Sequence, residues 1–311
     1  MTIESKLKSG LEDVVATESA ICYIDGDQGV LTYSGYDIHD LARSATFEEV
    51  CFLLWHRRLP TRSELGDLES ALASARRLPE GILRLVKSLP PGNPMDALRT
   101  LVSALAHYDS DAEDASAAAA YRKSVRLTAQ LGCLVATYGR VSAGGGPIAP
   151  DPALSHAANF LLMLTGDRPR EIEAHALDVA LILHADHELN ASTFAARVTA
   201  ATLSDVHSAT VAGIGALKGP LHGGANAEVM TMLRAIGEYA DDAHINKVVK
   251  DMLARKTKVP GFGHRVYRSE DPRARHMREG VERLVRLDVG VRRQKRRHRP
   301  LHALATPYWS R

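Results

Sequence analysis

The sequence predicts an all-α protein with one short β-hairpin near its N-terminus. Aromatic residues make up only 5% of the chain, whereas hydrophobic residues make up 45%. The core must therefore rest on Leu, Val, Ile and Ala, a composition that favours helices over a β-sandwich. Apolar residues recur at helical spacing, and Ala is abundant from residue 115 to residue 212. Runs of β-type residues are confined to residues 20–35.

The hairpin is expected where these β-type residues gather. The runs 20–24 and 30–33 contain Ile, Val, Tyr and Thr, and they flank the Gly- and Asp-containing cluster 25–29. Two such runs around a turn-forming cluster predict two short antiparallel strands.

Proline and glycine divide the helical part. Pro60 followed by Thr61 predicts a helix end and then the N-cap of the next helix. A short apolar face follows at 82–86, and the breaks at 90–94 and 144–152 predict loops. The clearest helical face repeats at i, i+4, i+7, i+8 and i+11. Its residues are Ile172, Ala176, Val179, Ala180 and Leu183.

Composition and charge argue against several classes of protein. Residues 1–12 lack the apolar core of a signal peptide, and no window approaches the roughly 18 apolar residues of a membrane span. Cys22, Cys51 and Cys133 show no CxxC spacing, which predicts reduced, buried thiols in a cytoplasmic protein. Excess basic charge gathers in residues 286–311, so no nucleic-acid surface is expected on the body.

Three segments place histidines at chain breaks or helix ends. They are residues 184–192, 218–226 and 258–273. A histidine at such a break can point into a cleft as a neutral donor or an acid. The glycines beside His222 and His264 are expected to let a ligand approach the backbone closely.

The chemistry of these segments favours an anionic organic ligand. His184 and His187 have the spacing of a metal pair, but no HExxH motif or Cys ligands accompany them, so no metal site is expected. The glycines of residues 213–219 do not match GxGxxG, which argues against a dinucleotide site. Arg273 could hold a carboxylate through two parallel bonds. The set suits a small, polyanionic oxo acid whose carbonyl must be polarised.

These segments resemble the citrate synthase family. Residues 261–273 read GFGHRVYRSEDPR and match its signature, G-[FYAV]-[GA]-H-x-[IV]-x-R-x-x-D-P-R, at every fixed position. Residues 219–226 resemble the first histidine loop of the family, and residues 184–192 resemble its oxaloacetate-side segment. The run 23–38 is similar to bacterial and archaeal members. The resemblance covers about residues 10–284.

The resemblance implies an almost wholly helical homodimer in which a small domain closes over the substrates. Residues 1–218 would belong to the large domain, residues 219–285 to an incomplete small domain, and residues 286–311 to a basic tail outside the family pattern. The implied reaction condenses acetyl-CoA with oxaloacetate and water to give citrate and CoA, the entry to the tricarboxylic acid cycle. It implies no cofactor, no metal, no nucleic acid and no membrane partner.

The resemblance also implies a role for each matched residue. His222 would donate to the enolate oxygen formed from acetyl-CoA, and His264 would donate to the carbonyl oxygen of oxaloacetate. His187 and Arg273 would bind oxaloacetate, while Ser192 would support the surroundings of His222. Arg268 would lie near the CoA phosphates. The residues expected to line the CoA path with backbone groups are Thr257, Lys258, Val259, Pro260 and Gly261.

The chemistry of the reaction agrees with this assignment. A thioester methyl group gives up its proton with difficulty, so the site must stabilise the developing oxyanion. Preorganised donors each contribute about 3–4 kcal/mol to such stabilisation. The site must also exclude water, which domain closure on the oxo acid would achieve.

The sequence after Leu284 departs from the family pattern. Members carry a general base, an aspartate in a segment like P-N-V-D-F-Y, and no such segment occurs here. Asp288 is the one acidic residue among residues 286–311, which hold eight Lys and Arg residues. Out-of-frame coding and a genuine anion-binding tail could each give this composition, and the loss of apolar periodicity favours the first. Such a tail is expected to be poorly ordered.

Three alternatives to an acetyl-CoA enzyme stay open. The motifs do not separate citrate synthase from 2-methylcitrate synthase, which uses propionyl-CoA. A catalytically dead chain that only dimerises with an intact copy is the second alternative. The third is a nucleic-acid-binding module that uses residues 292–299, whose DNA binding would weaken with salt.

Without the aspartate, we expect this chain to bind its substrates weakly and to turn them over little or not at all. A positioned base typically contributes about 10²–10⁴-fold to such a reaction. A thiol-release assay with acetyl-CoA and oxaloacetate measures this directly, and ordinary citrate synthase rates would contradict the expectation.

Overall fold

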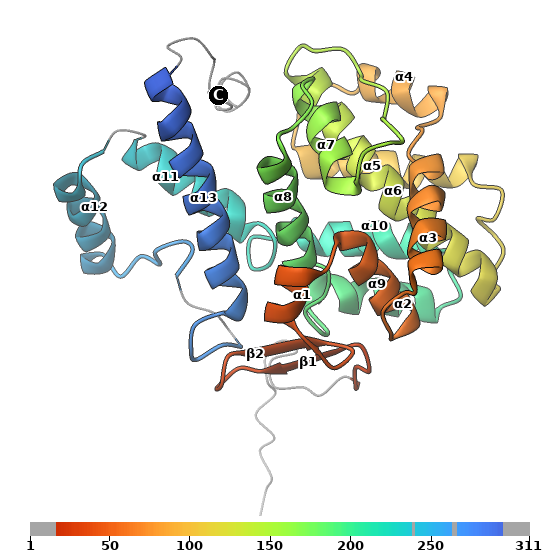
Figure 1. Cartoon of the computed structure of the whole chain (residues 1–311), viewed down its shortest axis with the longest axis horizontal. Coiled ribbons are helices and arrows are strands. Elements are labelled where there is room, and N and C mark those ends of the chain that lie inside the picture. The colour runs from red at the N-terminus through yellow and green to blue at the C-terminus, as the bar shows by residue number, and fades with distance from the viewer. Residues whose placement is uncertain (1–16, 238–239, 263–265, 295–311) are drawn as a thin grey trace, which may run out of the picture.

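The computed structural model describes residues 17–237, 240–262 and 266–294. Within these ranges the chain forms thirteen α-helices, one 3-10 helix and a three-stranded sheet. The predicted all-α class is therefore confirmed. Helices α1 to α10 gather over the small sheet, while α11 and α12 lie on the far side of α13 (Figure 1).

The helices alternate with short connections along the chain. In order they are α1 (Ile38–Ser44), α2 (Phe47–His56), α3 (Arg62–Ala75), α4 (Glu80–Ser88), α5 (Pro94–Leu105), η1 (Ala106–Tyr108), α6 (Ala117–Ser142), α7 (His156–Thr165), α8 (Glu171–Leu183), α9 (Ala191–Ala201), α10 (Val206–Leu217), α11 (Ala225–Ile236), α12 (Asp242–Ala254) and α13 (Pro272–Gln294).

The predicted hairpin is confirmed. Strand β1 (Cys22–Asp25) pairs antiparallel with β2 (Val30–Tyr33), with Cys22 opposite Tyr33. The Asp25 carboxylate accepts hydrogen bonds from the backbone N–H groups of Asp27 and Gln28, which stabilise the turn. A third strand, β3 (Tyr36–Asp37), was not expected, because two residues are too short for a periodic signal.

Local sequence signals explain several helix starts. Thr61 is the N-cap of α3 and forms a capping box with Glu64, as the Pro60–Thr61 pair predicts. Asn93 caps α5, and Pro94 occupies the first turn, where a missing N–H costs nothing. The expected loops at 90–94 and 144–152 lie between helices, except that Pro94 already belongs to α5.

Three groups of buried side chains form the core. The largest includes Leu101 and Leu134 and joins α4, α5, α6, α7 and α10. The second joins the hairpin to α1, α2 and α8 through Leu31, Leu53 and Ile182. A smaller group connects α2, α3 and α6. The three cysteines are buried and form no disulfide, as predicted.

Helix α13 contacts α8 and α1 and connects the two sides of the molecule (Figure 1). It continues past the expected start of the basic tail at residue 286 and ends at Gln294. Residues 286–294 are therefore helical, which corrects the expectation of disorder for this part of the tail. The Glu282–Arg286 pair, one turn apart, is of the kind that supports an exposed helix. Residues 295–311 lie outside the described part of the chain.

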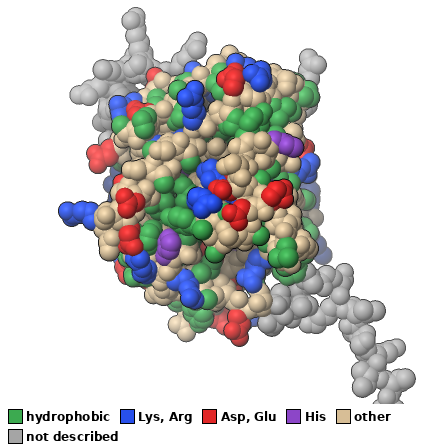
Figure 2. All heavy atoms as spheres, turned by 90° about the vertical axis from the view of Figure 1, so that its right-hand side faces the viewer, with side chains coloured by type: hydrophobic (Ala, Val, Ile, Leu, Met, Phe, Trp, Pro, Cys, Tyr) green, Lys and Arg blue, Asp and Glu red, His purple; other side chains and the backbone are tan. Residues whose placement is uncertain are grey.

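The surface shown in Figure 2 mixes acidic, basic and apolar side chains. Red and blue side chains alternate on this face, so it carries no basic field of the kind that attracts nucleic acid. Among the described residues, no helix is both long enough and apolar enough to cross a bilayer.

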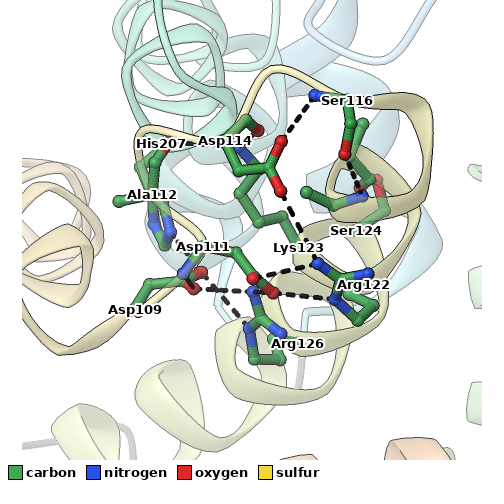
Figure 3. Close-up of polar contacts among 12 residues, drawn as sticks. Asp109, Asp111, Ala112, Asp114, Ser116, Arg122, Lys123, Ser124, Arg126 and His207 are labelled. Atoms are coloured by element: carbon green, nitrogen blue, oxygen red, sulfur yellow. Dashed lines mark hydrogen bonds and ion pairs between the residues drawn. The ribbon is translucent and has the colours of Figure 1, made fainter.

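A polar cluster fixes the loop between η1 and α6 (Figure 3). The Asp109 carboxylate contacts His207 Nε2 at 2.9 Å and Arg126 Nη2 at 2.6 Å, and its side chain is only 5% exposed. The buried Lys123 ammonium donates to the carbonyl oxygens of Ala112 and Asp114. The buried charges of Asp109 and Lys123 therefore each have ion-pair or hydrogen-bond partners, as buried charges require. The cluster ties the loop to α6 and α10.

We expect Asp109→Asn to destabilise the fold by about 3 kcal/mol, because it removes the buried carboxylate that pairs with Arg126 and bonds to His207. Urea unfolding followed by circular dichroism would measure the change. Asp111→Asn is the matched control, since Asp111 is more exposed and shares Arg122 and Arg126. An equal loss in both variants would contradict this account.

Candidate active site

The segment between α8 and α9 is held by the N-terminal hairpin. The Tyr33 hydroxyl lies 3.1 Å from the carbonyl oxygen of Ile182 and 3.0 Å from that of Asp186. Glu188 adopts the left-handed backbone region, with φ of 54°, and its carboxylate accepts a hydrogen bond from the Ile24 N–H. His187 therefore stands between two anchored residues.

This anchored segment is partly withdrawn from water. Burial raises the pKa of the Asp186 and Glu188 carboxyls above their usual values. Burial, helped by the charge of Asp186, also raises the pKa of the Cys22 thiol far above its usual range, so Cys22 is no nucleophile. The surroundings of His187 are thus of the kind in which polar interactions with a ligand gain strength.

His222 lies beside Ser192, as the sequence led us to expect. The Ser192 hydroxyl, in the first turn of α9, is 2.7 Å from Nε2 of His222. The His222 backbone N–H donates to the carbonyl oxygen of Gly219 in the turn that follows α10. Two elements therefore fix the ring, one through the backbone and the other through the side chain.

The glycines that follow His222 are required by the fold itself. A Cβ added to Gly223 would lie 2.6 Å from the carbonyl oxygen of Leu217, and one added to Gly224 would lie 2.9 Å from that of Gly219. They allow the turn to fold back on the end of α10. The expectation that they also let a ligand approach the backbone stays a prediction.

His187 and Arg273 meet around Tyr267. The His187 and Tyr267 rings contact edge to face, with centroids 5.6 Å apart. Tyr267 is 4% exposed, and burial raises the pKa of its hydroxyl, with the charge of Asp271 adding to the shift and that of Arg273 opposing it. Arg273 also interacts with Tyr33. The hairpin, the α8–α9 segment and the start of α13 therefore converge at one place.

The Arg273 side chain is oriented by its own helix start. Its Nε is 3.0 Å from Asp271 Oδ1, and its Nη2 is 2.7 Å from Asp271 Oδ2. Asp271 also accepts from the Arg273 backbone N–H, and Pro272 begins α13. Asp271 thus holds one edge of a half-buried guanidinium, while the opposite edge carries further donors for an anion.

The turn of the hairpin packs against residues 266–270. The Arg268 N–H donates to the Gly26 carbonyl oxygen at 2.9 Å. A Cβ on Gly26 would lie closer than 3.0 Å to the Val266 carbonyl oxygen, a separation that real Cβ atoms essentially never show. The exposed Arg268 side chain, expected near the CoA phosphates, lies 3.4 Å from Asp27.

The residues expected to line the CoA path form a turn after α12. The Thr257 N–H donates to the Met252 carbonyl oxygen, and Gly261 has φ of 87° and packs near Val229 of α11. His264 lies outside the described residues, so its convergence with His222 and Arg273 stays a prediction.

Two further observations bear on the predicted ligands. Nδ1 of His184 is 2.7 Å from the Ala180 carbonyl oxygen, so it points back along its own helix. In the described ranges, no three His, Cys, Asp or Glu side chains are grouped as metal ligands.

The sequence did not reveal Tyr33, Gly26 or Tyr267 as parts of the site. Tyr267 stands at a variable position of the signature, and Tyr33 looks like an ordinary strand residue. The Gly-Asp turn at 25–29 was a possible signal, but it indicated only a hairpin and not what the hairpin packs against.

Comparison with known proteins assigns the chain to a family. Residues 10–294 match the family model for the citrate synthase C-terminal domain. The chain belongs to the citrate synthase family. It is 49% identical over 278 residues to citrate synthase of Haloferax volcanii, covering 88% of this chain and 73% of the relative. It is 43% identical over 287 residues to 2-methylcitrate synthase of Mycobacterium tuberculosis, covering 92% and 72%.

Solved structures of citrate synthases share the fold. The enzyme from Pyrobaculum aerophilum superposes with a TM-score of 0.82 at 40% identity, covering 88% of this chain and 70% of that one. Citrate synthase from Thermoplasma acidophilum, in a ternary complex with carboxymethyl coenzyme A and oxaloacetate, superposes with a TM-score of 0.84 at 30% identity, covering 91% of this chain and 74% of that one. The citrate synthase fold thus extends over nine-tenths of this chain.

We expect Gly26→Ala to loosen residues 266–270, because the added methyl group must displace the Val266 carbonyl. Hydrogen–deuterium exchange of the peptide that contains Arg268 should become faster. Gly66→Ala is the control, since nothing lies within 4 Å of a Cβ at that position of α3. Unchanged exchange in Gly26→Ala would show that the hairpin turn does not hold this segment.

Proposed function

We propose that this protein condenses acetyl-CoA with oxaloacetate and water to give citrate and CoA. The single observation that carries the proposal is the convergence of His187, Tyr267 and Arg273 at a half-buried site formed by three separate segments. Membership of the citrate synthase family supports it, as does the oxaloacetate complex of the Thermoplasma acidophilum relative.

Arg273 and His187 form the oxo-acid side of the proposed site. The edge of the Arg273 guanidinium away from Asp271 would take a carboxylate of oxaloacetate, and His187 would donate to the same dianion. Because Asp271 already orients the guanidinium, little rotamer freedom is lost on binding. His264 would polarise the carbonyl group of oxaloacetate.

His222 forms the acetyl side. If the Ser192 hydroxyl donates to Nε2, the proton of the neutral ring resides on Nδ1. That N–H would then be available to donate to the enolate oxygen of the thioester. A neutral donor held by a partner hydroxyl stabilises developing negative charge without reorganising during the reaction.

CoA and domain closure complete the proposal. Residues 257–261 and Arg268 would contact CoA as residues 219–285 close over the substrates as the small domain. The active form would be a homodimer, because apolar residues of α8 and α9 are left uncovered and a second subunit would cover them. Within α8, only Ile182 and Leu183 are buried. In and after α9, Val198 and Leu203 are 52% and 87% exposed. We place this activity in the cytoplasm, where free thiols persist.

2-Methylcitrate synthesis is the second candidate, favoured by the 43% identity to the Mycobacterium tuberculosis enzyme of that name. Both reactions need the same donors to an enolate and to oxaloacetate. They differ by one methylene group on the acyl chain, a difference that pockets typically discriminate by about 10–200-fold.

One experiment tests the function and separates the candidates. Oxaloacetate binding is measured by calorimetry, and thiol release is then followed with acetyl-CoA and propionyl-CoA in parallel. Oxaloacetate-dependent release supports the proposal, and the preferred acyl-CoA selects the reaction. A chain that binds oxaloacetate without turnover fits the expectation drawn from the sequence after Leu284, or the inactive dimer partner. Absence of oxaloacetate binding would overturn the proposal.

We expect Arg273→Lys to weaken oxaloacetate binding by about 10–100-fold, because Lys keeps the charge and loses the planar fork. The measurement is the oxaloacetate dissociation constant at pH 7.5. Arg275→Lys is the control on the same helix, since Arg275 is exposed and pairs with Glu279. Equal affinity in both variants would show that Arg273 does not bind oxaloacetate.

A further inference from the structure

The position of α13 determines where Arg273 points. Arg273 lies in the first turn of this helix, which packs on α1 and α8. A cavity of about 710 Å³ lies between the three helices, lined by Ala42, Ile172, Met277 and Val281 among others. Val281 and Val285 are more than half exposed. Apolar packing therefore leaves this contact incompletely filled.

A pair of histidines joins α13 to α1 beside this cavity. Nδ1 of His39 is 2.7 Å from Nε2 of His276, and the ring centroids are 5.0 Å apart. The side chain of Asp37 accepts from the His39 N–H at 2.7 Å and so fixes the start of α1 to the sheet. His276 is 6% exposed and stands three residues after Arg273, on the next turn of α13.

The protonation state of the two rings determines whether this hydrogen bond can form. An N–H···N bond between two imidazoles needs one donor and one acceptor nitrogen, and a doubly protonated pair has no acceptor. Burial lowers the pKa of His276, and the positive charges of His39, Arg43 and Arg275 act in the same direction, whereas Glu279 opposes them. From α8, Glu173 and His175 face the same cavity. The bond can therefore exist while at least one of the two rings is neutral, and it is lost when both rings carry a proton.

We propose that His39 and His276 are positioning residues for the substrate, because their hydrogen bond fixes the first turns of α13 and so aims Arg273 at the oxo acid. The inference rests on the proposed function, in which Arg273 binds a carboxylate. Neither histidine touches the substrate. They act indirectly: the sheet fixes α1, α1 fixes α13 through the histidine pair, and α13 fixes the Arg273 guanidinium. A rotation of α13 by a few degrees would displace that guanidinium.

The test compares variants that break the bond with variants that keep it. His276→Ala and His39→Ala remove one partner. His276→Gln and His39→Asn place an amide where the bonding nitrogen was, and they do not titrate. His244→Ala is the control, because His244 is exposed on α12. Oxaloacetate dissociation constants are measured by calorimetry at pH 7.5 and at successively lower pH, with exchange of the α13 peptide as a second readout.

At pH 7.5 we expect the Ala variants to bind oxaloacetate about five- to tenfold more weakly, the effect of one lost hydrogen bond. The Gln and Asn variants should restore the affinity. As the pH falls through the lowered pKa of His276, the unaltered protein should lose affinity relative to the double variant His39→Asn/His276→Gln. All other titratable groups are the same in the two proteins, so this ratio isolates the His39–His276 pair. Exchange at the start of α13 should rise in the same order.

Each result decides the matter. If the unaltered protein fails to bind oxaloacetate, the proposed function falls and this inference with it. If it binds and His276→Ala binds equally well, the positioning role alone is overturned. If Gln is as weak as Ala, with α13 exchange unchanged, the hydrogen bond is not what aims Arg273. Rescue by Gln together with the relative loss of affinity on acidification supports the inference.

Discussion

The Tyr33 hydroxyl, buried at the end of β2, holds together parts of the chain that are far apart in sequence. It contacts the backbone at Ile182 and Asp186, where α8 ends and the segment with His187 begins. A buried hydroxyl without such partners would cost a substantial fraction of the net stability of a domain. The bond therefore both stabilises the hairpin and sets the course of the chain through the site. The Glu188 carboxylate makes a second contact between the same two segments, because it accepts a hydrogen bond from the Ile24 N–H.

Two of the buried carboxylates in this fold bind a partner from a distant element. Asp109 meets His207 from α10, and Glu48, which is 3% exposed, accepts from the His156 N–H at the start of α7. Burial lowers the pKa of His156 to about 4, so the ring is neutral and adds no charge to this region. Such pairs give each helix one preferred register against its neighbour, which apolar contacts alone specify less sharply.

The sequence predicted what depends on neighbours along the chain. Thr61 as an N-cap, the strand runs at 20–24 and 30–33, and the helical face from Ile172 to Leu183 were predicted from periodicity and turn chemistry, and the structure confirms them. It also predicted the Ser192–His222 pair, through the family resemblance. It could not show that Tyr267 lies against His187, because the two residues are far apart in the sequence and nothing along the chain signals that contact. The glycines after His222 show a related limit, since a sequence reveals a missing Cβ but not the atom it would meet.

The contact between Gly26 and the segment after residue 265 has a consequence for the order of folding. Gly26 and Ser269 are separated by 243 positions. During synthesis the hairpin emerges long before the surface that its turn rests on. The contact therefore forms only after the helices between the two segments have been made, and contacts of such long range tend to slow folding.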